Sequence, residues 1–323
     1  MNALPRNTIL EGDALTTLAH LPDESIDQII TSPPYFRLRD YGVAGQLGLE
    51  TSVDGWVSDL RAVLAQCARV LVPTGTLWLN LGDTYSTKPA DGGPRKSLLL
   101  GPERLALALL TSGWTIRNKI IWAKTNTVPT SVRDRLATKH EMIYLLTRSP
   151  RYFFALNEIR EPHTSRPPKP RETPAPSEST PAWLGPNSDG GKGLALLKSR
   201  GLIGHPLGKN PGDVWSLAVS NFRGEHFATF PEALVERMLR AGCPRWRCTR
   251  CHRPWRAPPS RTTVGEPLPT CDHDAPREPG LVLDPFMGAG TTALVARRLG
   301  RDYLGIELNP AFRQLALDRL DAA

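Results

Sequence analysis

Near the C-terminal end, a short apolar strand is followed by a glycine-rich turn, an amphipathic run and a second strand. The first strand is predicted at Leu281-Val282-Leu283, and the second, Tyr303-Leu304-Gly305-Ile306-Glu307, ends in a carboxylate. Such a unit is typical of doubly wound α/β sheets, where the Gly-x-Gly backbone approaches a nucleoside cofactor and the carboxylate accepts ribose hydroxyls. The turn has neither the Gly-Lys-Ser/Thr ending of a phosphate-binding loop nor the third glycine of the dinucleotide fingerprint. The cofactor-site residues predicted here are Asp284, Phe286, Gly288, Gly290, Thr291 and Glu307.

A second stretch, near the N-terminal end, combines a strand with two successive prolines. Residues 25–30 form an apolar, β-branched run typical of a buried strand, which leads into Thr31-Ser32-Pro33-Pro34-Tyr35. The prolines fix φ and remove two amide donors, so neither a helix nor a sheet continues. A surface turn is the plain alternative. The functional interpretation is a rigid corner that presents the Ser32 hydroxyl, the Pro33 carbonyl and the Tyr35 ring to a planar substrate carrying an amino group.

Together the two stretches resemble the amino-methylating DNA methyltransferases that use S-adenosylmethionine, the DNA methylase N-4/N-6 family. The Ser-Pro-Pro-Tyr stretch comes first and the Asp-Pro-Phe-x-Gly-x-Gly-Thr-Thr stretch comes last, which is the permuted order of the family's beta group. The resemblance covers residues 7–160 and 210–320. It implies a Rossmann-like α/β fold with a seven-stranded, mostly parallel sheet that contains one antiparallel strand.

The resemblance also implies a cofactor and roles for individual residues. S-adenosylmethionine would be the cofactor, and Ser32, Pro33, Pro34 and Tyr35 would be catalytic. Asp13, in Glu11-Gly12-Asp13, would lie near the cofactor adenine, although a helix N-cap or turn role fits it equally well. The run at 226–231 resembles the segment beside the methionine moiety, where Thr229 or His226 would contact the cofactor.

The chemistry expected of the corner follows from the weakness of an exocyclic amine as a nucleophile. Ser32 and Pro33 would accept the two amine protons and hold the nitrogen in line with an electrophilic methyl group. Such positioning contributes up to ~7–11 kcal/mol in favourable model systems. The target atom is hidden in a duplex, so base flipping is expected. Methylation at cytosine carbon-5 needs a cysteine, usually in a Pro-Cys pair, and the chain has only the reverse order, Cys243-Pro244.

The identity of the first corner residue predicts the target base. Family members with serine at this position mostly methylate cytosine at N4, and those with Asp or Asn mostly methylate adenine at N6. Ser32 therefore predicts cytosine-N4, with adenine-N6 as the alternative and RNA as a weaker one. A hypothesis of a different class is a non-catalytic, zinc-containing DNA-binding protein on a methylase scaffold.

Composition and charge agree with an enzyme that acts on nucleic acid. The 323 residues include 40 Lys and Arg against 32 Asp and Glu, a net charge of +8 that favours a polyanionic partner. We expect double-stranded DNA as the partner and leave open a cognate restriction endonuclease and either a monomer or a homodimer. No apolar run reaches membrane-spanning length, and residues 1–6 lack signal-peptide features, so we expect a cytoplasmic protein with no membrane partner.

Hydrophobic periodicity predicts the remaining elements. Helices are expected at 15–21, 54–71, 103–110, 231–240 and 291–299 and from 309 onward, with further strands at 76–80, 114–122 and 140–146. Cys67 lies on the apolar side of its helix and is predicted to fill the core. Residues 36–48 are predicted to form a mobile loop over the corner, and the pocket-wall candidates after strand 76–80 are Asn80, Asp83 and Tyr85.

Three segments are predicted along the chain. Residues 1–160 form the catalytic half, 161–211 a basic insert rich in Pro and Gly, and 212–323 the cofactor-binding half. Residues 162–181 contain almost no apolar side chain and are expected to be extended or disordered when free. The insert is either a plain linker or a target-recognition region that contacts DNA.

Four of the five cysteines lie between Cys243 and Cys271. In a chain expected to be cytoplasmic, such clustering indicates a metal rather than disulfides. The spacing predicts a zinc site with Cys243 and His252 as rival ligands, and free thiols in a turn are the alternative. Zinc would attach the loop 243–279 to the fold, with its arginines offering a basic face to DNA. The four predicted ligands are Cys248, Cys251, Cys271 and His273.

Overall fold

The computed structural model of the chain describes residues 4–127, 129–163, 205–219, 230–258 and 263–323. The chain forms two compact units. The larger unit comprises residues 1–155, 212–258 and 266–323, and the smaller unit comprises residues 156–211 and 259–265. Both sequence motifs and the predicted zinc ligands belong to the larger unit.

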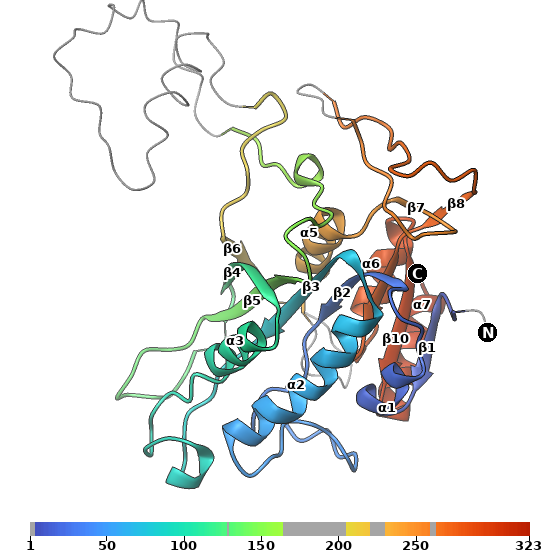
Figure 1. Cartoon of the computed structure of the whole chain (residues 1–323). Helices are drawn as coiled ribbons and strands as arrows, with labels where there is room; N and C mark the ends of the chain where they lie inside the picture. The colour runs from blue at the N-terminus through green and yellow to red at the C-terminus, as the bar shows by residue number, and fades with distance from the viewer. Residues whose placement is uncertain (1–3, 128, 164–204, 220–229, 259–262) are drawn as a thin grey trace, which may run out of the picture. The chain divides into compact units, whose positions relative to one another are not determined.

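The larger unit is built on an eight-stranded sheet (Figure 1). One strand runs antiparallel to both of its neighbours, and all other neighbouring strands are parallel. In their order across the sheet, the strands are β1 (Thr8–Glu11), β10 (Asp302–Glu307), β9 (Leu281–Asp284), β2 (Ile26–Thr31), β3 (Leu71–Leu81), the antiparallel β5 (His140–Thr147), β4 (Thr115–Lys124) and β6 (Val214–Leu217).

The expectation of seven strands is wrong by one, because the sheet has eight. β6, like β1, is not among the strands predicted individually from the sequence. It pairs in parallel with β4 at the edge of the sheet, with Trp122 opposite Trp215. Of its four residues only Trp215 is buried, and Val214 is 60% exposed. A short edge strand of this kind lacks the apolar alternation from which strands are predicted.

Helices cover both faces of the sheet (Figure 1). β2 is buried at all six residues, as expected of a parallel strand that is covered on both sides. The main hydrophobic core lies between the sheet and the first group of helices. That group is α1 (Ala14–Ala19), α2 (Val53–Val70) and α3 (Gly101–Thr111), and the second group is α5 (Glu232–Gly242), α6 (Thr291–Arg298) and α7 (Pro310–Asp321).

The helix α2 agrees with the helix predicted at 54–71. The Ser52 side chain accepts a hydrogen bond from Gly55 N and so caps the first turn. Cys67 is fully buried in the core, and its burial raises the pKa of the thiol to about 12. The prediction that Cys67 fills the core is confirmed.

β3 begins at Leu71, before the start predicted from the sequence. The sequence predicts the strand only at 76–80, after Pro73 and Gly75. The pairing with β2 shifts register between Ile26 and Gln28, and this irregularity lets the strand continue through the proline and the glycine.

Smaller elements complete the described structure. η1 (Pro89–Asp91) is a 3-10 turn, and β7 (Trp246–Cys248) and β8 (Arg277–Pro279) form a separate antiparallel pair. In the smaller unit, η2 (Leu156–Glu158) is followed by a bridge between Glu161 and Lys209. Most of the predicted insert, residues 164–204, lies outside the described residues. Within the described ranges, no helix combines the length and apolar character required to cross a membrane.

Candidate active site and metal cluster

The two sequence motifs meet because their strands are neighbours in the sheet. β2 ends at Thr31 and continues into residues 32–35, and β9 ends at Asp284 and continues into the turn at 285–290. The strands pair in parallel, so both segments leave the sheet at its carboxyl edge, where ligands bind in doubly wound folds. The Thr31 hydroxyl donates a 2.8 Å hydrogen bond to Asp284 Oδ1, which joins the two strand ends.

A cavity of about 450 Å³ lies at this edge, within the size range of small-molecule sites. It is lined on one side by the corner and on the other by the glycine turn and the end of β10. The predicted catalytic residues in its wall are Ser32, Pro33, Pro34 and Tyr35. The predicted cofactor residues in its wall are Asp13, Phe286, Gly288, Thr291 and Glu307.

Asp284, predicted as a cofactor residue, is an internal organiser of the turn. Its carboxylate also accepts hydrogen bonds from Phe286 N at 3.1 Å and Thr292 Oγ1 at 2.8 Å. The side chain is 1% exposed, and burial raises its pKa to about 6. All three donors belong to the protein, so the buried carboxylate stabilises the turn from the protein interior.

The glycine turn is held by Glu307. Its Oε2 accepts from Gly288 N at 2.7 Å and its Oε1 from Asn309 N at 2.9 Å, and burial raises the pKa of the carboxyl. Gly290 has a φ of +78°, in the left-handed region that favours glycine. A Cβ there would lie 2.8 Å from Ala316 Cβ, so Gly290 lets α7 approach the turn.

Of the remaining cofactor residues predicted from the sequence, only Asp13 lies within the described residues. Asp13 caps α1, since its Oδ1 accepts from Thr16 N at 2.9 Å, and it also lines the cavity. The N-cap interpretation of Asp13 is confirmed, and its contact with the cofactor stays a prediction. Thr229 and His226 lie outside the described residues, although Phe230, directly after them, contributes to the cavity wall.

A polar cluster lies beneath the corner. The Tyr35 hydroxyl donates a 2.7 Å hydrogen bond to Glu141 Oε2, and Asn80 Nδ2 donates to the same oxygen at 2.7 Å and to Tyr35 Oη at 2.8 Å. Ser32 Oγ lies 3.0 Å from Tyr35 Oη, and Lys124 Nζ forms an ion pair with Glu141 Oε1. Burial and the Glu141 charge raise the pKa of Tyr35 well above its usual value, so its hydroxyl stays protonated.

Two further contacts fix the corner. Trp56 Nε1 donates a 2.9 Å hydrogen bond to the Pro34 carbonyl. On the other side, a Cβ at Gly82 would lie 2.6 Å from the Tyr35 ring, so the ring packs directly on the backbone that follows β3. The corner is therefore positioned by the core on one side and by bare backbone on the other.

Of the three pocket-wall candidates, only Asn80 lines the cavity. Asp83 accepts from the backbone N–H groups of Leu100 and Gly101 and so anchors the start of α3. The Tyr85 ring lies 3.8 Å beneath the Arg135 guanidinium. The prediction for Asp83 and Tyr85 is wrong, because neither side chain lines the cavity and each contacts another part of the chain.

The sequence analysis predicts the strand at 140–146 but names neither Glu141 nor Lys124 as a site residue. Both line the cavity, and they come from neighbouring antiparallel strands, with Lys124 at the end of β4 and Glu141 near the start of β5. A signal was present, because each is a charged residue at the end of a predicted apolar strand. It carries meaning only once the two strands are known to pair.

Two arginines of the loop over the corner, residues 36–48, have different surroundings. Arg37 forms a 2.8 Å ion pair with Asp91, whose side chain is 1% exposed, and therefore supports the loop. Arg39 lines the cavity.

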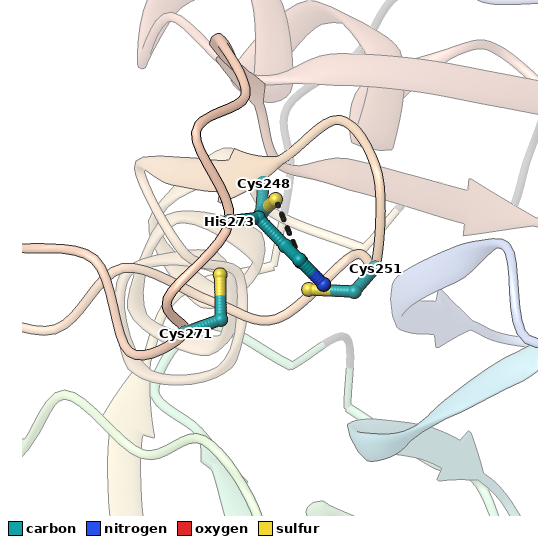
Figure 2. A group of neighbouring side chains, drawn as sticks. All are labelled: Cys248, Cys251, Cys271 and His273. Atoms are coloured by element: carbon teal, nitrogen blue, oxygen red, sulfur yellow. Dashed lines mark hydrogen bonds between the residues drawn. The ribbon is translucent and has the colours of Figure 1, made fainter.

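The four predicted zinc ligands lie together, with their ligand atoms all within 4.8 Å of one another. Figure 2 shows the three cysteine side chains and His273 pointing toward a common centre. The rival ligands are elsewhere. Cys243 is fully buried, and His252 Nδ1 lies 3.0 Å from the Glu24 carbonyl oxygen.

Comparisons with known proteins identify the family of the chain. A family model described as DNA methylase matches residues 26–318. The type II methyltransferase M.XycI of Xanthomonas campestris pv. cyanopsidis is 35% identical over 336 residues, which cover 97% of this chain and 87% of the relative. M.SmaI of Serratia marcescens is 31% identical over 333 residues, which cover 97% of this chain and 90% of the relative.

Solved structures show the same fold. The PvuII DNA methyltransferase, described as cytosine-N4-specific, superposes with a TM-score of 0.60 at 17% identity, covering 98% of this chain and 89% of that chain. TTHA0409 of Thermus thermophilus, solved in complex with S-adenosyl-L-methionine, superposes with a TM-score of 0.54 at 23% identity, covering 98% and 95%. The chain therefore belongs to the N6/N4 family of DNA methylases and is a DNA methyltransferase.

Proposed function

We propose that the protein transfers a methyl group from S-adenosylmethionine to the N4 amine of cytosine in double-stranded DNA. The observation that carries the proposal is one cavity lined by both the Ser32–Tyr35 corner and the turn around Gly288. A methyl donor held by the turn and an amine held by the corner would meet inside it. Membership of the DNA methylase family supports DNA as the substrate.

The residues of the turn fit S-adenosylmethionine, which supplies an electrophilic methyl group when bound. Each carboxylate oxygen of Glu307 has a second lone pair, so the side chain can accept from ribose hydroxyls while it keeps its bonds to Gly288 and Asn309. Phe286 and Phe312 also line the cavity and would offer apolar surface to an adenine ring. Asp13 lies in the wall as well.

The corner would bind the flipped base. Ser32 Oγ and the Pro33 carbonyl would accept the two protons of the amine, and the Tyr35 ring would stack on the base. Because Tyr35 Oη is already a donor to Glu141, the ring has a fixed setting. Positioning of this kind lowers the barrier to in-line attack. S-adenosylmethionine would supply the methyl group, and the amine nitrogen, held by Ser32 and the Pro33 carbonyl, would release one of its two protons to water.

The base assignment rests on Ser32. In the family this chain resembles, serine at the first corner position accompanies cytosine-N4 methylation, and adenine-N6 is the alternative. We also propose that residues 161–211 contact the target sequence. The resemblance to type II methyltransferases supports a cognate restriction endonuclease as a partner.

The test is methyl transfer from labelled S-adenosylmethionine to duplex DNA, followed by nucleoside mass spectrometry. We expect 4-methylcytosine from the wild type and from Ser112→Ala, an exposed serine at the end of α3. Ser32→Ala should lose the product while its cofactor affinity is kept. Appearance of 6-methyladenine would show that the base assignment is wrong. Absence of any methylated nucleoside from a wild type that binds the cofactor would overturn the proposal.

A further inference from the structure

We propose that Cys248, Cys251, Cys271 and His273 bind one structural zinc ion that holds the loop 243–279 against the amino end of β2. The site is separate from the methyl-transfer cavity and goes beyond the proposed activity. Three observations support the proposal: the geometry of the ligands, the small number of buried residues in the loop, and a buried arginine that connects the cluster to the sheet.

The ligand geometry is close to that of a bound ion. Ligand atoms 2.0–2.3 Å from a tetrahedral zinc lie about 3.3–3.8 Å from one another. Cys248 Sγ and His273 Nδ1 are 3.8 Å apart, and all four ligand atoms fall within 4.8 Å (Figure 2). Shifts of about 1 Å in side-chain position therefore complete the tetrahedron.

The ligand set determines the kind of site. Three cysteine sulfurs and one imidazole occupy all four positions of a tetrahedral ion and leave none for substrate, which is the pattern of structural zinc. The segment between the first two ligands forms a tight turn, in which His252 N donates a 2.9 Å hydrogen bond to the Cys248 carbonyl and Cys248 N donates a 3.0 Å hydrogen bond to the Arg253 carbonyl.

The loop has little else to hold it. Among the described residues from 249 to 279, only Pro254 is buried. The two strands of the loop, β7 and β8, have three residues each, and Cys248 lies opposite Arg277 at the outer end of this short pair. A segment with so little apolar burial needs a cross-link or a metal to stay folded.

Arg247 connects the cluster to the central sheet. Its side chain is 1% exposed and donates to the Ser25 carbonyl at 2.6 Å, while it pairs with Asp27 at 3.0 Å and with Glu278 at 2.8 Å. Because Arg247 directly precedes the ligand Cys248, the position of β7 on the sheet and the position of the metal depend on each other.

This connection corrects part of the expected DNA-binding face. Arg247 faces the protein interior rather than solvent. Arg256, also expected on that face, donates a 2.9 Å hydrogen bond to the Tyr152 carbonyl oxygen. The proposed role of the ion is therefore to hold the loop in place.

The test measures metal content, which does not depend on methyl transfer. Protein purified without chelator should contain one zinc per chain by inductively coupled plasma mass spectrometry. His273→Asn and Cys251→Ser should lose it. The matched control is His252→Asn, which should keep the full equivalent, because that residue lies outside the cluster and its φ of +54° suits asparagine. Removing zinc from the wild type should lower its melting temperature, and adding zinc should restore it.

The wild type also provides a test that needs no variant. Cobalt(II) added to the zinc-free protein should give the visible absorption of a tetrahedral ion with thiolate ligands. Absence of metal binding, iron in place of zinc, or a disulfide between two of the three cysteines in the purified protein would overturn the proposal. So would full zinc content in both His273→Asn and Cys251→Ser.

Discussion

The Tyr35 hydroxyl donates a 2.7 Å hydrogen bond to Glu141 across a separation of 106 positions in the chain. Glu141 in turn pairs with Lys124 and accepts from Asn80. The aromatic ring of the corner is thus oriented by a carboxylate that comes from a different part of the sequence. If the Tyr35 ring stacks on the target base, as we propose, the orientation of the ring depends on residues outside the motif.

We expect Glu141→Gln to slow methyl transfer about 10–100-fold, because a hydrogen bond to a charged group contributes about 1.5–3 kcal/mol. Glutamine keeps the shape but loses the charge that Lys124 and Tyr35 contact. Single-turnover rates measure the loss. Cofactor affinity should stay unchanged, and Glu103→Gln, which removes a surface pair with Lys119, serves as the control. An equal loss of cofactor affinity would contradict a role confined to the corner.

Glu307→Gln should weaken cofactor binding about 10–100-fold, because one acceptor oxygen is replaced by a donor that opposes Gly288 N or Asn309 N. We expect a higher dissociation constant for S-adenosylmethionine, which calorimetry measures. The control is Glu11→Gln, which changes an exposed carboxylate at the end of the adjacent strand β1. Unchanged affinity in Glu307→Gln would show that this carboxylate does not contact the cofactor.

Gly82→Ala should reduce the rate of methyl transfer at least tenfold while the protein stays folded. The added Cβ would lie 2.6 Å from the Tyr35 ring, so the ring has to move from its position in the corner. Gly212→Ala is the matched control, since nothing lies within 4 Å of a Cβ built there. Full activity in Gly82→Ala would mean that the position of the ring is not critical.

Asp284→Asn should change how stability depends on pH. Burial raises the pKa of Asp284 to about 6, above its value in the unfolded chain. The folded state keeps the proton where the unfolded chain has lost it, so this group lowers wild-type stability as pH rises from about 4 to about 6, by on the order of 3 kcal/mol in total. Asparagine removes that dependence.

Urea unfolding at several pH values measures this effect. The difference in unfolding free energy between Asp284→Asn and the wild type should move in favour of the mutant as pH rises through that window. Asp318→Asn, at an exposed position in α7, should leave the pH dependence of the wild type unchanged. A difference that stays constant between pH 4 and 6 would disprove the assignment.

Much of the fold could be predicted because its elements have simple burial patterns. The predicted helix at 54–71 is α2, and the predicted strand at 140–146 is β5. Both motifs could also be predicted because each is local. In each case an apolar strand, a turn with special backbone requirements and a polar side chain follow one another along the chain.

The features that could not be predicted from the sequence are those that depend on pairing between distant segments. Glu141 reaches Tyr35 only because β5 inserts between β3 and β4, and no local pattern specifies that insertion. Asp83 lies at a strand end, where active-site residues are expected, yet its carboxylate binds the first amides of α3. β6 is a strand only because β4 offers it an unpaired edge.

The parallel pairing of β2 and β9 sets the spacing between the two motifs. Parallel neighbours in a sheet lie about 4.8 Å apart, a distance fixed by backbone hydrogen bonding. The proposed donor site follows one of these strands and the proposed acceptor site follows the other. In the proposed reaction, the spacing of these two strands would therefore set the distance between the donor site and the acceptor site. Side-chain substitutions at either site can change affinity or orientation, but this spacing belongs to the backbone.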